Sequence, residues 1–241
     1  MKYMGSKARF AKDFLPIILK QRENGQTFVD LFCGGCSVVQ LVDGSRIAND
    51  INTHLIEMWK GLVADPEYYP KYIPRDFYSD VRDSYNKKDG RFTDALIGYV
   101  GFMGSYNGRF FDGGYSGHAV EIKNGKTRDY IGENIKNTMA QIKYLKDVKF
   151  LNYDYRKCPI PPHSLIYCDI PYKGTKQYST SRNFDYDEFY MWCIKMKEAG
   201  HTIFVSEYAM PPVFKCVWEK SAKTTINQTI TKNAVERLFT L

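Results

Sequence analysis

The segment FVDLFCGGCSV, residues 28–38, decides the fold class of this chain. Residues 27–32 form a short run rich in β-branched and aromatic side chains, which predicts a buried strand. The run stops at the turn formed by residues 33–35, and a helix is expected to start at Ser37. A strand that passes through a glycine-rich turn into a helix is the opening unit of an α/β sheet.

The same order of elements repeats around this segment. Strands are predicted over residues 46–49, 148–152, 164–168, 201–206, 214–219 and 236–240, and helices over 7–22 (with a kink at Pro16), 52–63, 131–145 and 186–199. Strands that alternate with helices predict an α/β fold with a mostly parallel sheet. Ligands of such sheets bind at the carboxyl ends of the strands.

A different pattern occupies residues 60–147, which interrupt this alternation. They are rich in Tyr, Asp and Lys, and a glycine cluster over residues 98–117 favours loops or a hairpin rather than a core helix. We therefore expect an inserted, mostly helical lobe that carries a hairpin. The sheet domain is then formed by residues 1–59 and 148–241.

The composition excludes a disordered chain, a collagen-like chain and a small protein held together by disulfides. The chain has 241 residues, 44% of them hydrophobic and 25% charged, which is ordinary for a globular domain. The net charge of +7 is compatible with a polyanionic partner. No apolar run approaches the ~18 residues of a membrane span. The N-terminal apolar run is too short for a signal peptide, so the six cysteines are expected to be free thiols in a reducing, cytoplasmic compartment.

Two features near the N-terminus suggest a small-molecule site. The glycines of the 33–36 turn allow close approach to the backbone, and the start of a helix favours an anionic group such as a carboxylate. Asp50 follows the next strand, where an acid commonly accepts the ribose hydroxyls of a nucleoside. Three alternatives remain open at this point: a tight structural turn, a redox pair of Cys33 and Cys36, and a helix-capping role for Asp50.

A third feature, Asp169-Ile170-Pro171-Tyr172, follows the strand predicted at 164–168. An exocyclic amine of a nucleic-acid base needs hydrogen-bond acceptors and a flat surface beneath the ring. The carboxylate of Asp169 and the carbonyl of Ile170 can accept hydrogen bonds, and Tyr172 can stack. The three features together favour a functional site over a structural turn.

These motifs resemble, in order, those of the Dam-type (D12 class) adenine-N6 DNA methyltransferases. The matching stretches are KYMGSK at 2–7, FVDLFCGGCSV at 28–38, ANDIN at 48–52, NYDY at 152–155, DIPY at 169–172, and a tail that includes KNAVERLF at 232–239. The resemblance implies a Rossmann-like S-adenosylmethionine-dependent methyltransferase sheet, with S-adenosyl-L-homocysteine as product and no metal. It implies cofactor contacts from Tyr3, Lys7, Asp30, Phe32, Cys33, Gly34, Gly35, Cys36, Asp50 and Asp154, and catalysis by Asp169, Ile170, Pro171 and Tyr172.

The usual D-P-P-Y of that family is D-I-P-Y in this chain. The second residue of the motif mainly offers its backbone carbonyl, which Ile170 retains. Pro171 also restricts Ile170 to the extended region, so we expect the geometry of the motif to survive, although a loss of rate stays open. The inserted lobe corresponds to the target-recognition lobe, where Tyr106, Asn107, Arg109, Lys123 and Lys126 are the expected DNA contacts. Arg109 suits a bidentate contact to guanine.

The resemblance thus implies a site-specific DNA adenine-N6 methyltransferase that acts on an adenine flipped out of double-stranded DNA. Two alternatives stay open: the same chemistry on RNA adenine or on cytosine N4, and a non-catalytic nucleic-acid-binding remnant. We expect no membrane partner, a monomer or weak dimer, and a bacterial host cell in which the gene belongs to a phage or mobile element. A cognate restriction endonuclease is a further expected partner.

Overall fold

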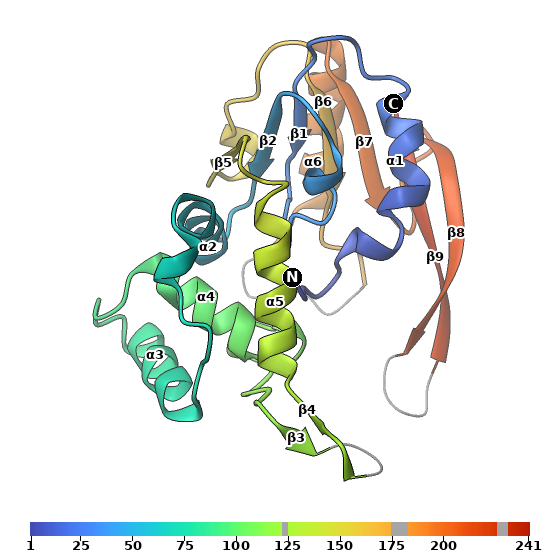
Figure 1. Ribbon diagram of the computed structural model, residues 1–241. Coiled ribbons are helices and arrows are strands. Elements are labelled where there is room, and N and C mark those ends of the chain that lie inside the picture. The colour runs from blue at the N-terminus through green and yellow to red at the C-terminus, as the bar shows by residue number, and fades with distance from the viewer. Residues whose placement is uncertain (122–124, 175–182, 226–230) are drawn as a thin grey trace.

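A seven-stranded sheet forms the centre of the structure, a computed structural model that describes residues 1–121, 125–174, 183–225 and 231–241 (Figure 1). The strand order is β5-β2-β1-β6-β7-β9-β8. The bounds are β1 Phe28–Asp30, β2 Arg46–Asn49, β5 Val148–Leu151, β6 Leu165–Asp169, β7 Thr202–Glu207, β8 Lys215–Thr225 and β9 Thr231–Thr240. The first five strands in this order are parallel, and β9 is antiparallel to both β7 and β8. The predicted mostly parallel α/β sheet is confirmed.

The order of the strands reverses between β1 and β6. After β1 the chain moves to β2 on one side, and it later returns to pair β6 with the other side of β1. In α/β sheets, ligands bind at the carboxyl ends of the strands beside the point where the strand order reverses. Asp30 ends β1 and Asp169 ends β6.

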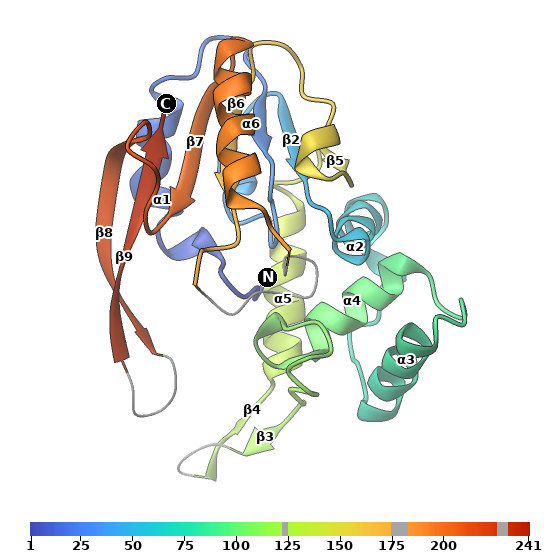
Figure 2. The ribbon, with the colours of Figure 1, turned by 180° about the vertical axis from the view of Figure 1, so that it is seen from behind.

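Alternating side chains pack the two faces of the sheet against different helices. Val29 and Ile166 join a hydrophobic cluster with α6 (Tyr186–Glu198), whereas Phe28 and Tyr167 join a second cluster with α1 (Ala11–Leu19). Figures 1 and 2 show α6 on one face of the sheet and α1 on the opposite face. The helices predicted over these regions are confirmed, and Pro16 lies inside α1.

A mostly helical lobe follows β2. Its elements are α2 (Thr53–Ala64), α3 (Arg75–Lys87), α4 (Asp94–Gly104), α5 (Tyr130–Ile142) and a small hairpin of β3 (Val120–Glu121) and β4 (Thr127–Arg128). This hairpin projects away from the sheet (Figure 1). Helices α2, α4 and α5 share one hydrophobic cluster with β1 and β6, so the core continues from the sheet into the lobe.

The sequence predicts loops or a hairpin over the glycine cluster, residues 98–117, and this prediction is wrong for the first part of the cluster. Residues 98–104 belong to α4, and every one of them is buried. An added Cβ at Gly98 would overlap the carbonyl oxygen of His54 in α2, and one at Gly104 would lie 2.7 Å from the ring of Tyr78. These glycines therefore serve close packing of α4 against its neighbours, which outweighs their low helix propensity.

The helix expected from Ser37 is also wrong. Only a 3-10 turn, η2 (Val39–Leu41), follows the glycine-rich turn. Cys36 adopts a left-handed conformation with φ 56°, which no α-helix contains. The backbone N–H of Val39 donates to Oδ2 of Asp30 at 3.3 Å, so this buried carboxylate holds the turn in place. In the described part of the chain, no helix combines the length and apolar character needed to cross a membrane.

Candidate active site

The carboxylate of Asp169 lies at the end of β6 and is paired with a lysine from the start of the chain. Nζ of Lys7, in the short 3-10 helix η1 (Lys7–Arg9), lies 3.0 Å from Oδ1 of Asp169. Both side chains are largely buried, with exposed fractions of 7% for Lys7 and 20% for Asp169. The resemblance assigned Lys7 to the cofactor, whereas the structure places its ammonium at the expected catalytic carboxylate.

Burial sets the protonation of this pair. It raises the pKa of Asp169 to about 6, although the charge of Lys7 and its hydrogen bond act in the opposite direction. Burial opposes the charged form of Lys7 as well, but Asp169 and Glu236 together raise the pKa of Lys7 above its ordinary value. The carboxylate of Asp169 is therefore ionised at neutral pH, next to a charged ammonium.

Tyr172 lies against the same ammonium. Nζ of Lys7 lies 4.3 Å from the centre of the Tyr172 ring. The rings of Tyr172 and Tyr208 are in edge-to-face contact, with their centroids 4.5 Å apart. The hydroxyl of Tyr172 donates to Oε2 of Glu236 at 2.7 Å. The structure thus brings three sequence-predicted residues together, namely Lys7, Asp169 and Tyr172.

Two buried glutamates of this site were missed by the sequence reasoning. Glu236 in β9 accepts from Tyr172, and Glu207 at the end of β7 accepts from the backbone N–H groups of Tyr208 and Lys173. Burial raises the pKa of Glu207 to about 7. The signals in the sequence were an acid directly after the strand predicted at 201–206 and one at the start of the strand predicted at 236–240, and neither reveals its partners.

The side chain of Ile170 explains why an isoleucine fits the D-I-P-Y sequence. It is buried in the hydrophobic cluster formed with α6, together with Cys168 and Phe189. The carbonyl oxygen of Pro171 accepts from the hydroxyl of Tyr186 at 2.9 Å. The turn after β6 is therefore held by apolar packing against α6 and by a hydrogen bond from α6.

The glycines of the 33–36 turn make room for Tyr3. A Cβ added to Gly34 would lie 2.6 Å from Cε1 of Tyr3, and one added to Gly35 would lie 2.8 Å from its Cβ. The indole N–H of Trp59 donates to the carbonyl of Gly34 at 3.2 Å. The space opened by the missing side chains is thus filled by Tyr3, and the hydrogen bond from Trp59 connects the turn to α2.

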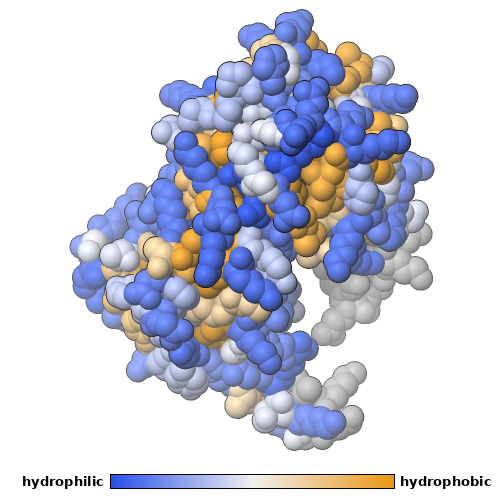
Figure 3. Space-filling view, turned by 45° about the horizontal axis from the view of Figure 1, so that its top comes forward, coloured by the Kyte–Doolittle hydropathy of each residue, from blue (hydrophilic) through white to orange (hydrophobic). Residues whose placement is uncertain are grey.

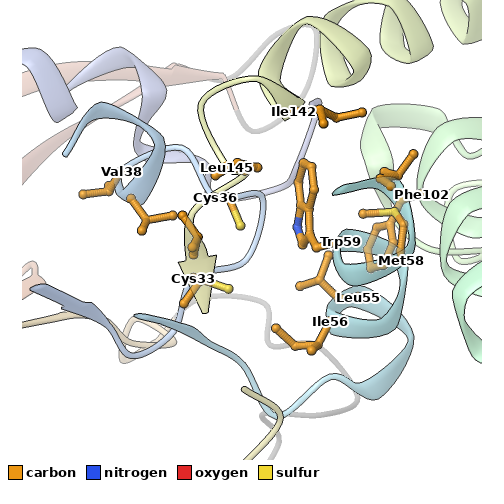
Figure 4. Packing of buried hydrophobic residues seen from close by; sticks show 14 of the residues in the cluster. Cys33, Cys36, Val38, Leu55, Ile56, Met58, Trp59, Phe102, Ile142 and Leu145 are labelled. Carbon is orange, nitrogen blue, oxygen red and sulfur yellow. The ribbon is translucent and has the colours of Figure 1, made fainter. Parts of the chain in front are cut away.

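The redox alternative for Cys33 and Cys36 is wrong. Both thiols are buried in the hydrophobic cluster around Trp59, where Leu55 and Leu145 also lie (Figure 4). Burial raises the pKa of Cys33 well above its ordinary value and also raises the pKa of Cys36. No helix begins beside them to stabilise a thiolate, so both act as apolar core residues.

Asp50 faces the same turn. Its Oδ2 accepts from the backbone N–H of Gly34 at 3.1 Å, and its Oδ1 accepts from that of Asn52 at 2.9 Å. The residue that caps α2 is Asn52, which accepts from Leu55, so the capping alternative for Asp50 is wrong. Each carboxylate oxygen carries two lone pairs, so Asp50 retains capacity to accept from a ligand.

The remaining expected cofactor residues have protein partners. Asp154 accepts from Nε of Arg156 at 2.7 Å and Nη2 at 2.6 Å, and the hydrogen bond to Arg156 lowers the pKa of Asp154. Phe32 packs with the rings of Tyr155 and Phe189. Asp30 bonds η2, as described above. These side chains line the same edge but are engaged by the fold.

The expected DNA-contacting residues lie in the lobe, at a distance along the chain from the catalytic motif. Tyr106 and Asn107 are exposed, and they line a cavity of about 200 Å³ together with Lys2, Arg128 and Tyr130. Nη2 of Arg109 is paired with Oδ2 of Asp112 at 2.6 Å. Lys126 is exposed next to β4, and Lys123 lies outside the described residues.

The surface near this lobe is open and hydrophilic. Figure 3 shows a surface on which hydrophilic side chains predominate, with hydrophobic patches between them. A hydrophilic surface with exposed aromatic and basic residues suits a polyanionic partner better than a membrane or an apolar protein face.

Comparisons with known proteins agree with this geometry. Residues 3–205 match the family described as D12 class N6 adenine-specific DNA methyltransferase. The modification methylase StsI of Streptococcus sanguinis is 26% identical over 196 residues, which cover 71% of this chain. The matched region is 28% of that relative, so the chain spans only a part of the relative's length.

Proposed function

Because the chain belongs to the D12 class of N6 adenine-specific DNA methyltransferases, we propose that it transfers a methyl group from S-adenosylmethionine to N6 of an adenine in double-stranded DNA. The observation that carries the proposal is the buried pair of Asp169 and Lys7 beside Tyr172, at the edge where the strand order reverses. This edge is where α/β sheets bind their ligands.

Asp169 and Ile170 would activate the substrate amine. The lone pair of adenine N6 is delocalised into the ring, which makes the amine a weak nucleophile. The carboxylate of Asp169 and the carbonyl of Ile170 are acceptors for its two N–H groups, and they favour the pyramidal form in which the lone pair is localised. Lys7 holds Oδ1 of Asp169, so Oδ2 is the oxygen that would accept the amine hydrogen.

The residues at the ends of β1 and β2 fit a nucleoside cofactor. Asp50 has lone pairs left for ribose hydroxyls and is fixed by two backbone N–H groups. Ile51, its neighbour, is 50% exposed and offers an apolar surface next to that carboxylate. When bound, S-adenosylmethionine supplies the electrophilic methyl group. The chain's own part is to orient the two reactants and to exclude water.

The lobe would hold the DNA. An adenine must leave the duplex before its N6 can reach Asp169. Tyr106 is 53% exposed and lies beside Lys2 and Arg128, so it can occupy the space left by the flipped base while the two cations contact phosphates. A role beside a cognate restriction endonuclease is part of this proposal, and the name of the StsI relative as a modification methylase supports it.

Sequencing of modified bases tests the proposal. DNA from bacteria that express the wild-type chain is compared with DNA from bacteria that express Asp169→Asn, which keeps the shape of the side chain but removes its charge. We expect N6-methyladenine within one short sequence motif for the wild type and at least ~10²-fold less methyl transfer for the variant. Purified protein with labelled S-adenosylmethionine and DNA or RNA distinguishes the substrates. Transfer only to RNA or to cytosine would overturn the proposal, as would no transfer at all.

A further inference from the structure

We propose that Glu236 is a positioning residue of this active site, which anchors the Tyr172 ring and shares the Lys7 ammonium so that Asp169 keeps an oxygen free for the substrate. This inference rests on the proposed function. Glu236 lies outside residues 3–205, the segment that matches the family. The evidence for its role is therefore the contact geometry.

The position of Glu236 in β9 is unusual for a carboxylate. Glu236 is only 8% exposed, and it lies on the same face of the strand as Leu238, which belongs to the core cluster with α1. A buried carboxylate is costly unless it is paired and hydrogen-bonded. Glu236 has both kinds of partner, the Tyr172 hydroxyl at 2.7 Å and the Lys7 ammonium at 3.7 Å.

The first consequence concerns the ammonium of Lys7. It lies 3.0 Å from Asp169 and 3.7 Å from Glu236, so the two carboxylates share one cation. An ammonium attracted only by Asp169 could engage both oxygens of that carboxylate. Glu236 attracts Lys7 from the other side and leaves Asp169 with acceptor capacity.

The second consequence concerns the ring of Tyr172. Its hydroxyl is held by Glu236, its face by Lys7, and the ring of Tyr208 meets it edge-on. Tyr172 is only 8% exposed, and a ring fixed at its far end cannot rotate freely, so the Tyr172 ring keeps one orientation. Such anchoring lowers the entropy lost when the substrate base stacks.

Three variants test the inference. Glu236→Gln keeps the size and an acceptor oxygen but removes the charge, and Tyr172→Phe keeps the ring but removes the anchored hydroxyl. Glu219→Gln is the matched control, because Glu219 lies on the neighbouring strand and is exposed. We expect kcat to fall at least tenfold in Glu236→Gln and in Tyr172→Phe. The dissociation constant for S-adenosylmethionine should stay within twofold of wild type in all three.

The pH profile of kcat separates positioning from general support of the fold. The titratable groups that interact electrostatically with Asp169 are Lys7, Asp30, Tyr167, Cys168, Tyr172, Glu207 and Glu236. Among them Glu236 is a negative charge that raises the pKa of Asp169. Glu236→Gln should therefore move the acidic limb of the kcat profile to lower pH. An unchanged limb with unchanged kcat would overturn the inference.

Urea unfolding of the same proteins tests the contact without methyl transfer. The effect of the double variant on unfolding should be smaller than the sum of the single effects, because Glu236→Gln removes the charge from the same hydrogen bond that Tyr172→Phe abolishes. Full additivity would overturn the contact. A wild type that transfers no methyl group but shows this coupling would instead overturn the proposed function alone.

Discussion

The ammonium of Lys7 lies 3.0 Å from Oδ1 of Asp169, so the first turn of the chain holds the carboxylate that ends strand β6. Burial is the largest influence on the pKa of Asp169 and raises it, so it favours the protonated form of this carboxyl. The cation of Lys7 limits that effect. The N-terminal segment thereby decides whether the site can accept hydrogen bonds from a substrate.

The first prediction concerns the pH dependence of methyl transfer. Asp169 must be ionised to accept from the amine, and its pKa is about 6, so kcat should rise through this pH in the wild type. Lys7→Met removes the charge that lowers the pKa of Asp169, so the acidic limb of the profile should move to higher pH. Exposed Lys12, changed to Met, is the control. A limb that stays in place in Lys7→Met would contradict the assignment.

The second prediction concerns cofactor binding at Asp50. Asp50→Ala removes the acceptor fixed by Gly34 and Asn52, and it should weaken binding of S-adenosylmethionine by roughly 1–3 kcal/mol, or about 5- to 150-fold. Isothermal calorimetry measures the change. Asp43→Ala, at an exposed position in the preceding loop, should leave the affinity unchanged. Equal affinities for wild type and a folded Asp50→Ala would remove Asp50 from the site.

The third prediction separates base reading from phosphate binding in the lobe. Arg109→Ala should relax the preferred sequence at one guanine, since such a contact discriminates by roughly 1–3 kcal/mol. Arg109 is paired with Asp112, so DNA must displace that carboxylate. Exposed Lys126, changed to Ala, should weaken binding to all sequences alike and reduce the salt dependence. Genome-wide sequencing of modified adenines distinguishes base reading from phosphate binding. An unchanged recognition motif in Arg109→Ala would show that Arg109 contacts only the DNA backbone.

The fourth prediction concerns stability and Glu207. Its pKa in the folded protein is about 7, against 4.5 ordinarily, so the folded state keeps a proton that the unfolded state has lost between these values. The stability that this proton contributes is fully present below pH 4.5 and is lost as the pH rises through 7. The loss amounts to about 3 kcal/mol at most, at 1.36 kcal/mol for each pKa unit.

Urea unfolding between pH 4.5 and 7.5 measures this effect. Glu207→Gln cannot ionise, so its free energy of unfolding should fall less over this range than that of the wild type. Glu198→Gln, at an exposed position of α6, should follow the wild type. Parallel curves for Glu207→Gln and the wild type would show that Glu207 does not titrate in this range.

The fifth prediction concerns the close packing of α4 on α2. Gly98→Ala places a Cβ against the backbone carbonyl of His54, which cannot move without shifting α2. We expect a loss of about 1–3 kcal/mol in the free energy of unfolding, as is usual for overpacking. Ser37→Ala, outside the helices, is the control, because it makes a small change without a clash against a backbone carbonyl. Gly90→Ala is unsuitable because Gly90 has a positive φ. Equal stability of Gly98→Ala and wild type would contradict the packing.

The sequence by itself indicated the local motifs and the places of the strands in the central sheet, although β8 and β9 extend well beyond the predicted residues 214–219 and 236–240. The strand predicted at residues 164–168 lies within one residue of the observed β6, because the apolar run Leu165–Cys168 has few alternatives to a buried strand. Asp169 and Tyr172 were found together because they are neighbours in the chain. The acids that end β1 and β6 and follow β2, namely Asp30, Asp169 and Asp50, were also predictable, since parallel strands end at one edge of a sheet. Glu207 at the end of β7 was missed.

Only the tertiary structure decided which distant groups complete the site. Lys7 and Glu236 meet Asp169 and Tyr172 because η1 and the antiparallel strand β9 lie against the end of β6, and no spacing in the sequence fixes that arrangement. The glycines of α4 became helical because α2 and Tyr78 pack closely against them. The thiols of Cys33 and Cys36 became unreactive because the core encloses them. Burial and long-range pairing depend on the whole fold, so a local pattern cannot supply them.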